Sequence, residues 1–343
     1  MSTIKDVALL AGVSFTTVSH VLNQTRPVSE KARLRVLDAV AELGYVPSAV
    51  ARSLRKSETG IVGVLVPTVQ NPFFAELVCG AEEACRQAGY SVFLCNSDND
   101  PHRQQHYLRT LLEKRVDGLL VASVGEPESF DRVLGSSGLP CVAMDRLMPG
   151  AQADRISLDN RGGAELATQH LLALGHSHIA CISGPQKVEV SQARVKGWRA
   201  ALKARQIEAQ ADWLQVSDFS TAGGYQAAMT LLRAPARPSA IFACNDLMAL
   251  GVLRAAAELG LAVPAELSVM GFDNIELGGF VHPGLSTVGC SIRKLGREAG
   301  RLLIARIDQP SQALRHVQLN PELVIRESCA PMQARRTGRR DKS

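Results

Sequence analysis

Polar and aromatic residues that could bind a small ligand stand directly after several apolar runs of this chain. The residues concerned are Asn71, Phe73 and Phe74 after 61–66, Asp145 and Arg146 after 141–144, Asn245 after 240–243 and Asp273 after 267–271, with Arg194 and Phe219 beside two further predicted helices. Carboxylates, guanidinium and amide groups can chelate neighbouring hydroxyls, and aromatic faces suit the apolar C–H faces of a sugar ring. Each residue alone is better explained as a cap, turn or surface residue, but their recurrence at six loops favours a site for a small polyhydroxylated ligand.

The sequence lacks the common signatures of catalysis and cofactor binding. It has no Gly-Lys dipeptide for a phosphate-binding loop, no Gly-x-Gly-x-x-Gly after the first apolar run and no Gly-x-Ser-x-Gly elbow. Asp145 and Asp273 could form an acid/base pair, but nothing identifies a nucleophile or leaving group. His102 and His106 are four residues apart with no third ligand near. We therefore expect no enzyme, no cofactor and no metal site.

From residue 61 onward, apolar runs alternate with amphipathic stretches. The strands and helices that this pattern predicts would position the polar loops described above. Strands are predicted at 61–66, 92–95, 118–121, 141–144, 179–182, 240–243 and 267–271, and helices near 73–88, 102–114, 161–174, 192–205, 222–233 and 246–259. This alternation is typical of doubly wound parallel sheets with helices on both faces. A segment of about 270 residues is too long to form a single hydrophobic core, so two subdomains are predicted. Ligands of such sheets bind outside the carboxyl ends of the strands, where the polar loops lie.

The first 45 residues predict a different, all-helical unit of three short helices. Thr3 can cap the first helix and Gly12 can end it, Ser14 can cap the second, and Ser29 can cap a third that ends at Gly44. The first two helices have the proportions of a helix-turn-helix. The stretch 48–56 is compatible with a helix that is too short to be stable alone.

Composition and charge agree with a globular chain whose basic residues gather at its ends. The 343 residues are 46% apolar and 21% charged, and no apolar run is long enough to span a membrane. Residues 1–60 hold eight basic and five acidic side chains, and residues 330–343 hold five and one. A basic head predicts a polyanionic partner, although a solvated charged surface would show the same excess. The eight cysteines are interpreted as buried, reduced side chains, and the start shows no export signal, so a cytoplasmic, nucleoid-associated protein is expected.

Two segments resemble the LacI/GalR family of transcriptional repressors. They are Ile4-Lys-Asp-Val-Ala-Leu-Leu-Ala-Gly-Val-Ser-Phe-Thr-Thr-Val-Ser-His-Val-Leu-Asn23, which is similar to the family's DNA-binding head, and Val46-Pro-Ser-Ala-Val-Ala-Arg-Ser-Leu54, which is similar to its hinge helix. The resemblance runs from about residue 3 to 329. Within the family it is greatest to the ribose-responsive branch and next to the purine-responsive branch.

The resemblance implies a set of DNA contacts. The residues are Thr3, Ser14, Phe15, Thr16, Thr17, His20, Asn23 and Arg26 in the head, and Ser48, Ala51, Arg52, Leu54 and Arg55 in the hinge. The second helix would lie in the major groove of each half-site. Paired hinge helices would wedge Leu54 into the minor groove at a central CG step. The expected partner is therefore a palindromic double-stranded operator that binds a homodimer.

The resemblance also implies a periplasmic-binding-protein-like core whose effector is a sugar. Its ribose-contact positions correspond to the nine loop residues named above, and the purine-responsive branch has other residues at Arg146 and Asn245. Cys290 stands where sugar binders carry a Gln, and a thiol cannot replace an amide. D-ribose is the expected effector. The departure at Cys290 predicts either weaker binding of this effector or a related pentose or nucleoside in its place.

The predicted fold is thus a small all-α helix-turn-helix head followed by an α/β core of two doubly wound subdomains. The predicted boundaries are 1–45 for the head, 46–60 for the hinge, 61–329 for the core and 330–343 for a disordered basic tail. Within the core, 61–159 with 291–320 would form one subdomain and 160–289 with 321–329 the other. Two alternatives stay open, namely a purine-responsive repressor that requires a corepressor and a sugar-binding receptor.

Overall fold

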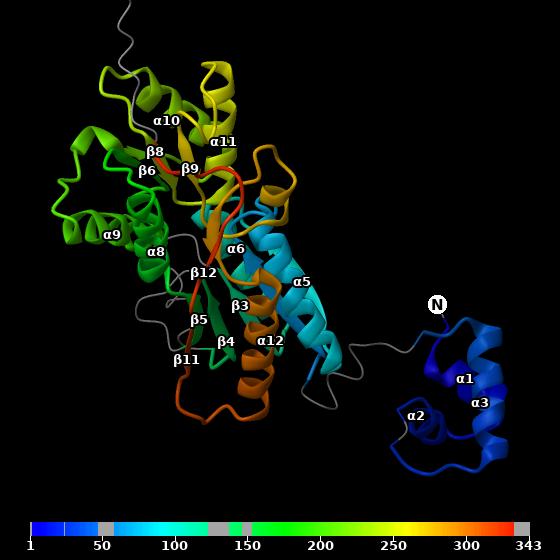
Figure 1. Ribbon diagram of the computed structural model, residues 1–343. Helices are drawn as coiled ribbons and strands as arrows, with labels where there is room; N and C mark the ends of the chain where they lie inside the picture. The colour runs from blue at the N-terminus through cyan, green and yellow to red at the C-terminus, as the bar shows by residue number, and fades with distance from the viewer. Residues whose placement is uncertain (1, 24, 47–57, 123–136, 146–152, 333–343) are drawn as a thin grey trace, which may run out of the picture. The chain divides into compact units, whose positions relative to one another are not determined.

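The computed structural model describes residues 2–23, 25–46, 58–122, 137–145 and 153–332, and the chain divides into two units, Met1–Gly60 and Ile61–Ser343 (Figure 1). Each unit is described by itself. Several predicted site residues lie outside the described residues, namely Ser48, Ala51, Arg52, Leu54, Arg55 and Arg146. Most of the predicted tail, from residue 333, lies outside them as well.

The first unit holds three helices, α1 (Ile4–Ala11), α2 (Phe15–Asn23) and α3 (Glu30–Leu43). Thr3 and Asp6 form a reciprocal capping box at the start of α1, and the left-handed Gly12 ends it with φ +59°. The Ser14 hydroxyl accepts from the Thr17 amide at 3.1 Å, as predicted. Ser29 is the N-cap residue of α3, as predicted, but it caps the helix with its carbonyl, which accepts from the Arg33 amide, while its hydroxyl makes no cap hydrogen bond.

A small apolar core holds the three helices together. Val7, Val18 and Val36 come from α1, α2 and α3 and are fully buried against one another. Their positions follow the helical period, so each helix buries one stripe and exposes the rest. The first residues of α2 therefore remain at the surface.

The larger sheet of the second unit contains six parallel strands in the order β11-β5-β4-β3-β1-β2. Their bounds are β1 Ile61–Val66, β2 Ser91–Asn96, β3 Gly118–Val121, β4 Cys141–Met144, β5 Asp154–Leu158 and β11 His316–Leu319. Alternate residues of β1 point to opposite faces: Val62, Val64 and Val66 enter one apolar cluster and Leu65 another. Both faces are apolar because helices cover both, as expected of a doubly wound sheet.

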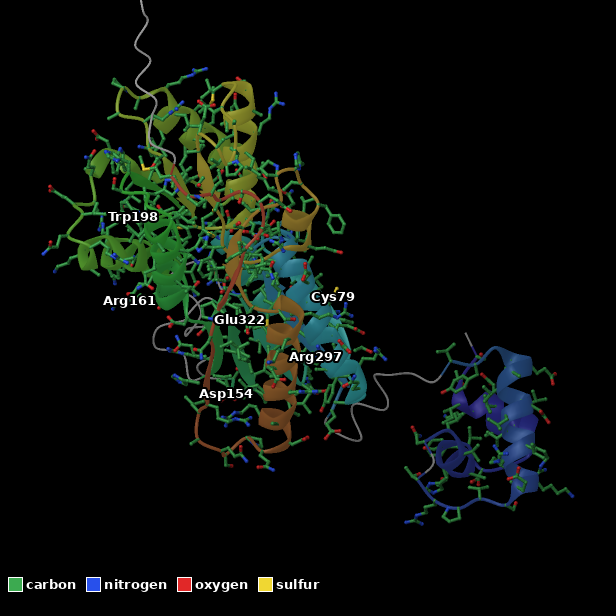
Figure 2. All side chains as sticks on the ribbon, viewed as in Figure 1. Cys79, Asp154, Arg161, Trp198, Arg297 and Glu322 are labelled. Atoms are coloured by element: carbon green, nitrogen blue, oxygen red, sulfur yellow. The ribbon has the colours of Figure 1, made fainter. Side chains whose placement is uncertain are left out.

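The helices α5 (Pro72–Gln87) and α12 (Ile292–Asp308) cover one face of this sheet, and α6 (Pro101–Glu113) packs on β1 from the other side. Figure 2 labels Cys79 on α5 and Arg297 on α12, two helices that lie side by side. They approach closely at Gly80 and Gly296, where a Cβ atom would overlap backbone of the facing helix. Larger residues at these two positions would separate the helices.

The smaller sheet has four parallel strands in the order β7-β6-β8-β9. They are β6 Ile179–Ser183, β7 Leu214–Val216, β8 Ala240–Ala243 and β9 Ser268–Met270, with helices α8 Asn160–Ala173, α9 Glu189–Ala204, α10 Thr221–Arg233 and α11 Asp246–Glu258. Figure 1 shows α8 and α9 on one side of this sheet and α10 and α11 on the other. The fully buried Trp198 of α9, labelled in Figure 2, donates its indole N–H to the Ile179 carbonyl at 3.2 Å.

A short antiparallel pair, β10 (Thr287–Gly289) with β12 (Glu322–Val324), forms a third, two-stranded sheet. Two short 3₁₀ turns, η1 (Ala211–Trp213) and η2 (Glu276–Gly279), complete the described elements. The fold class expected from the sequence is confirmed: a helix-turn-helix head and a core of two parallel, doubly wound sheets.

Several elements escaped prediction from the sequence. The strands β5, β7, β10, β11 and β12 and the long helix α12 were not expected. In β5, Asp154 interrupts the apolar pattern and is nevertheless fully buried, because both of its oxygens accept from Arg306 at 2.8 Å. The pair links α12 to β5, so both elements depend on a contact between residues 152 positions apart in sequence.

The expected burial of the cysteines is confirmed only in part. Cys85, Cys141, Cys181 and Cys244 are buried as predicted, but Cys79 is exposed on α5, and the other three are half-buried.

In the part of the chain that the structure describes, no helix is both long and apolar enough to cross a membrane.

Candidate functional site

A cavity of about 140 Å³ lies where loops at the carboxyl ends of both parallel sheets meet. Eight of the ten predicted effector residues line it: Asn71, Phe73, Phe74, Asp145, Arg194, Phe219, Asn245 and Asp273. They come from elements up to 202 positions apart in sequence, as Asn71 and Asp273 show. A cavity of this size fits one small ring with its substituents rather than an extended chain.

Arg194 is held at the cavity by groups on all sides. Its guanidinium donates to the Asn160 side chain at 2.8 Å and to the Cys244 carbonyl, and it lies 3.2 Å from the Asp273 carboxylate. Its flat face covers the Phe272 ring, 3.8 Å from the ring centre. The side chain is 4% exposed, so its position is set before any ligand arrives.

The Asp273 carboxyl is the buried acidic partner of this cation. Burial raises its pKa well above the ordinary value, Arg194 opposes that shift, and the Asp246 and Asp145 carboxyls reinforce it. A ligand hydroxyl could donate to this carboxyl without displacing Arg194, because a carboxylate has room for several donors.

Four cavity residues have left-handed backbone conformations. Asn99 follows β2 with φ +55°, Asp145 follows β4 with φ +59°, Phe219 precedes α10 with φ +68°, and Asp273 follows β9 with φ +112°. Such conformations are unfavourable for residues with a Cβ and gather at functional sites, where the surrounding structure holds them. Gly184 helps to hold Phe219, because a Cβ atom on Gly184 would overlap the Phe219 ring.

Asn71 and Asn245 each cap the start of a helix and also line the cavity. The Asn71 side chain accepts from the Phe73 amide at 3.0 Å at the start of α5. Asn245 accepts from the Met248 amide at 2.9 Å at the start of α11 and donates to the Phe219 carbonyl at 3.0 Å. These bonds fix both amide groups, and the second ties Phe219 to α11.

Asp246 follows the cavity residue Asn245 and binds the loop after Asp273 through the Ile275 amide. Its two oxygens accept from the Thr287 hydroxyl at 2.6 Å and the Ile275 amide at 2.8 Å. Burial raises the pKa of Asp246 to about 7, although these hydrogen bonds act in the opposite direction. The residue is fully buried and contacts no open space of its own.

Sequence reasoning missed several residues that line the cavity: Thr68, Gln70, Asn99, Val190, Asp218, Ser220 and Leu247. Asn99 follows β2 and could have been found by the same strand-end argument that selected Asn71. Asp218 accepts from Ser220 at 2.6 Å, and although burial alone would raise its pKa, the hydrogen bonds of Ser220 and Ser217 lower it. Asn160, which orients Arg194, carries no local signal in the sequence.

Cys290 is not among the residues that line this cavity. It lies in a separate hollow with Cys79, Asn274 and Phe280, although the Asp145 and Asp273 carboxyls are near enough to add to the effect of burial, which raises its pKa to about 11. An effector contact at Cys290 therefore stays a prediction.

In the head, the predicted DNA-contacting side chains gather on and around α2. Phe15 is 50% exposed, and Thr16, Asn23 and Arg26 are exposed as well. His20 is half-buried, with Nδ1 2.7 Å from the Thr25 hydroxyl. Thr3 and Ser14 serve as caps, with their side chains turned to the backbone, so any DNA contact would use their remaining hydrogen-bonding capacity.

The head and core define a class of ligand-responsive DNA-binding proteins, and comparisons with known proteins place the chain within that class. Residues 3–48 match the model of bacterial regulatory proteins of the lacI family, and residues 168–329 match the periplasmic binding protein-like domain. Curated relatives include the HTH-type transcriptional repressor PurR of Photobacterium profundum, 42% identical over 96% of this chain and 98% of the relative. PurR of Haemophilus influenzae (strain PittEE) is 41% identical with the same coverage. The chain belongs to the LacI family and is a DNA-binding transcriptional repressor with a small-molecule effector site.

Solved structures of the family agree with this assignment. The lac repressor dimer bound to operator and the anti-inducer ONPF has a TM-score of 0.86 at 30% identity, covering 96% of this chain and 99% of that one. A LacI family regulator from Enterococcus faecium with bound ribose has a TM-score of 0.73 at 32% identity, covering 80% and 100%. The expectation that the ribose-responsive branch is nearest needs correction, since the curated relatives above bear the name PurR.

Proposed function

We propose that this repressor binds a palindromic operator as a homodimer in the cytoplasm and is released by a small sugar, D-ribose in the first instance. The observation that carries the proposal is the set of buried polar groups that meet in one small cavity: Arg194, Asp273, Asp145 and Asn245. Such a set matches a ring with hydroxyls on several carbons, because carboxylates accept from hydroxyls while guanidinium and amide groups donate to them.

The aromatic side chains that line the cavity also support a sugar as the effector. Phe73 and Phe74 stand edge to face with ring centres 5.1 Å apart at one wall, and Phe219 is at the other sheet's loops. Rings in this arrangement offer apolar faces to the C–H groups of a furanose or pyranose. The ribose bound to the Enterococcus faecium regulator supports the same ligand class.

A purine is the second candidate effector, and the names of the curated relatives favour it over a sugar. A flat base could stack on Phe73 or Phe219, and its ring nitrogens and exocyclic groups could pair with Asp273 and Arg194. In that case the ligand would act as a corepressor and strengthen operator binding, whereas a sugar inducer would weaken it. The sign of the ligand effect therefore separates the two candidates.

The proposed DNA contacts come from two parts of the chain: side chains on and around α2, which would contact one half-site, and Leu54 of the hinge, which would enter the central step. The exposed Phe15, Thr16 and the nearby Thr17 and His20 would contact base edges and phosphates of one half-site. Leu54 of each protomer would enter a central CG step, and the contacts of the bent site would offset the cost of unstacking. Sugar-driven closure of the core would then prevent the two hinges from pairing.

The test is fluorescence anisotropy of the full chain on a labelled palindromic operator with a central CG step, at one fixed salt concentration. D-ribose and hypoxanthine are titrated separately into the preformed complex. Release by ribose supports the sugar-induced repressor, and tighter binding with hypoxanthine supports the purine alternative and overturns the sugar assignment. A variant Arg194→Met should lose the response to either ligand while it still binds the operator.

A further inference from the structure

A second cavity, of about 300 Å³, is lined by residues of α9, of the edge strand β7 and of the end of β6. Its polar lining comes from Ser183, Gln186, Ser191, Gln192, Lys196 and Arg199, with Leu214 of β7 as part of an apolar wall. Of the described residues, none lines both this cavity and the effector cavity. Nothing in the proposed repressor mechanism uses it.

The charged side chains that line this cavity are both basic. Lys196 and Arg199 are exposed and neither forms a salt bridge with another described residue. Ser191, Val195 and Arg199 recur every four residues on α9, and Lys196 lies beside them on the neighbouring row. This spacing places the two cations and the serine along one helix face.

Ser191 supplies an independent sign of a missing partner. The residue is 1% exposed, and its hydroxyl oxygen has no hydrogen-bond partner among the described residues. Buried polar groups are nearly always paired, and one left unpaired destabilises the fold. A ligand oxygen at the bottom of the cavity would complete the bonding of this hydroxyl.

The start of α9 adds to the preference for a negative ligand. The helix begins after Val188, whose side chain makes no cap hydrogen bond, and Ser191 lies in its first turn. The first turn of a helix carries partial positive charge and attracts anions. Glu189 of the same turn is exposed and does not line the cavity.

We propose that this cavity binds a phosphate group, with Lys196, Arg199 and Ser191 as its donors. A phosphate has several strong acceptor oxygens, and a guanidinium and an ammonium bind it by charge-assisted hydrogen bonds. Val195 and Leu214 would face the carbon skeleton of a phosphate ester. The site would thus take a small phosphorylated metabolite as a second ligand, whatever effector occupies the first cavity.

Isothermal titration calorimetry of the full chain with inorganic phosphate and, separately, with glycerol phosphate tests the proposal. We expect saturable binding of one ligand per chain, weaker at higher salt. The double variant Lys196→Ala with Arg199→Ala should weaken it by about tenfold or more, as expected for the loss of two charge-assisted contacts. Ser191→Ala should weaken it by a smaller factor.

The matched control is Lys203→Ala with Arg205→Ala, which removes the same two charges from the exposed end of α9 outside the cavity. Its affinity should equal that of the unchanged chain. Binding of the ester alone would assign the site to phosphorylated metabolites, and binding of both would assign it to the phosphate group itself. Absence of saturable binding, or equal losses in the two double variants, overturns the proposal.

Discussion

The guanidinium of Arg194 lies 3.2 Å from the carboxylate of Asp273, and the two side chains are only 4% and 6% exposed. One belongs to the middle of α9, and the other follows β9, 79 positions later in the chain. Because the pair lines the cavity, the same contact supports the fold and presents two polar groups to the proposed effector. Removing either partner should therefore affect stability and binding together.

Arg194→Met tests this double role. The change leaves the Asp273 carboxyl buried without its cation, and a broken buried pair typically costs about 3–5 kcal/mol of unfolding free energy. Urea denaturation followed by fluorescence of the buried Trp198 and Trp213 measures the loss. Arg161→Met is the control, since Arg161 is 64% exposed and pairs at the surface with the half-buried Glu165, a contact expected to matter by less than about 1 kcal/mol. Equal losses in both variants would contradict the prediction.

Gly184→Ala should reduce effector affinity without weakening operator binding. A Cβ atom at this position would overlap the Phe219 ring, which must then leave its place at the cavity. Calorimetric titration with D-ribose and with hypoxanthine measures the effect, and anisotropy measures operator binding. Gly278→Ala is the matched control, because its nearest neighbour, Leu285, would be at 3.6 Å, an ordinary contact. Unchanged effector affinity in Gly184→Ala would show that Phe219 makes no contact with the ligand.

Asp246 should make stability depend on pH near neutrality. Burial raises its folded-state pKa to about 7 from the ordinary 3.8, so the folded state holds a proton that the unfolded state releases at lower pH. Its stabilising contribution is complete below about pH 4 and is lost as the pH rises toward and through 7. In Asp246→Asn, the amide could still accept from Ile275 and donate to Thr287. Denaturation midpoints from about pH 5 to 8 should thus fall less steeply in this variant than in the unchanged chain, and parallel slopes would refute the assignment.

Phe15→Ala should weaken operator binding by about tenfold or more if its ring contacts base edges. The side chain is 50% exposed, so the head core of Val7, Val18 and Val36 should stay intact. Leu9→Ala, 85% exposed on α1, removes an apolar side chain of the same head outside the proposed contacts. Anisotropy at one salt concentration compares the two variants, and equal losses would remove Phe15 from the proposed interface.

Leu54→Ala should retain the fold and lose operator affinity and bending. Leu54 lies outside the described residues, and its proposed role rests on the family resemblance of the hinge segment. Anisotropy gives the affinity, and gel mobility of circularly permuted operator fragments gives the bend. Full affinity with full bending in this variant would refute the wedge.

Much of the fold could be predicted because its signals are local. The strands β1, β3, β4 and β8 begin and end where their apolar runs do, and Gly12 and Gly44 end α1 and α3 in left-handed conformations. The strand-end argument also brought together eight cavity residues, since parallel strands present their carboxyl ends at one edge. The elements α12 and β5 were not predicted, because their local sequences do not show a clear apolar pattern. The helix α12 is rich in arginine, and β5 begins with the buried Asp154.

The sequence by itself determined the class of fold: the helix-turn-helix, the alternating core and the loops that carry the predicted ligand-binding groups all follow from short-range patterns of apolar residues, caps and turns. Only the tertiary structure decided which groups meet. Asn160 reaches Arg194, and Arg306 pairs with Asp154. Cys290 is not among the residues that line the effector cavity, although Asp145 and Asp273 lie near it. Contacts of this kind depend on the free energy of burying charged and polar groups in pairs, and no local pattern encodes the partner.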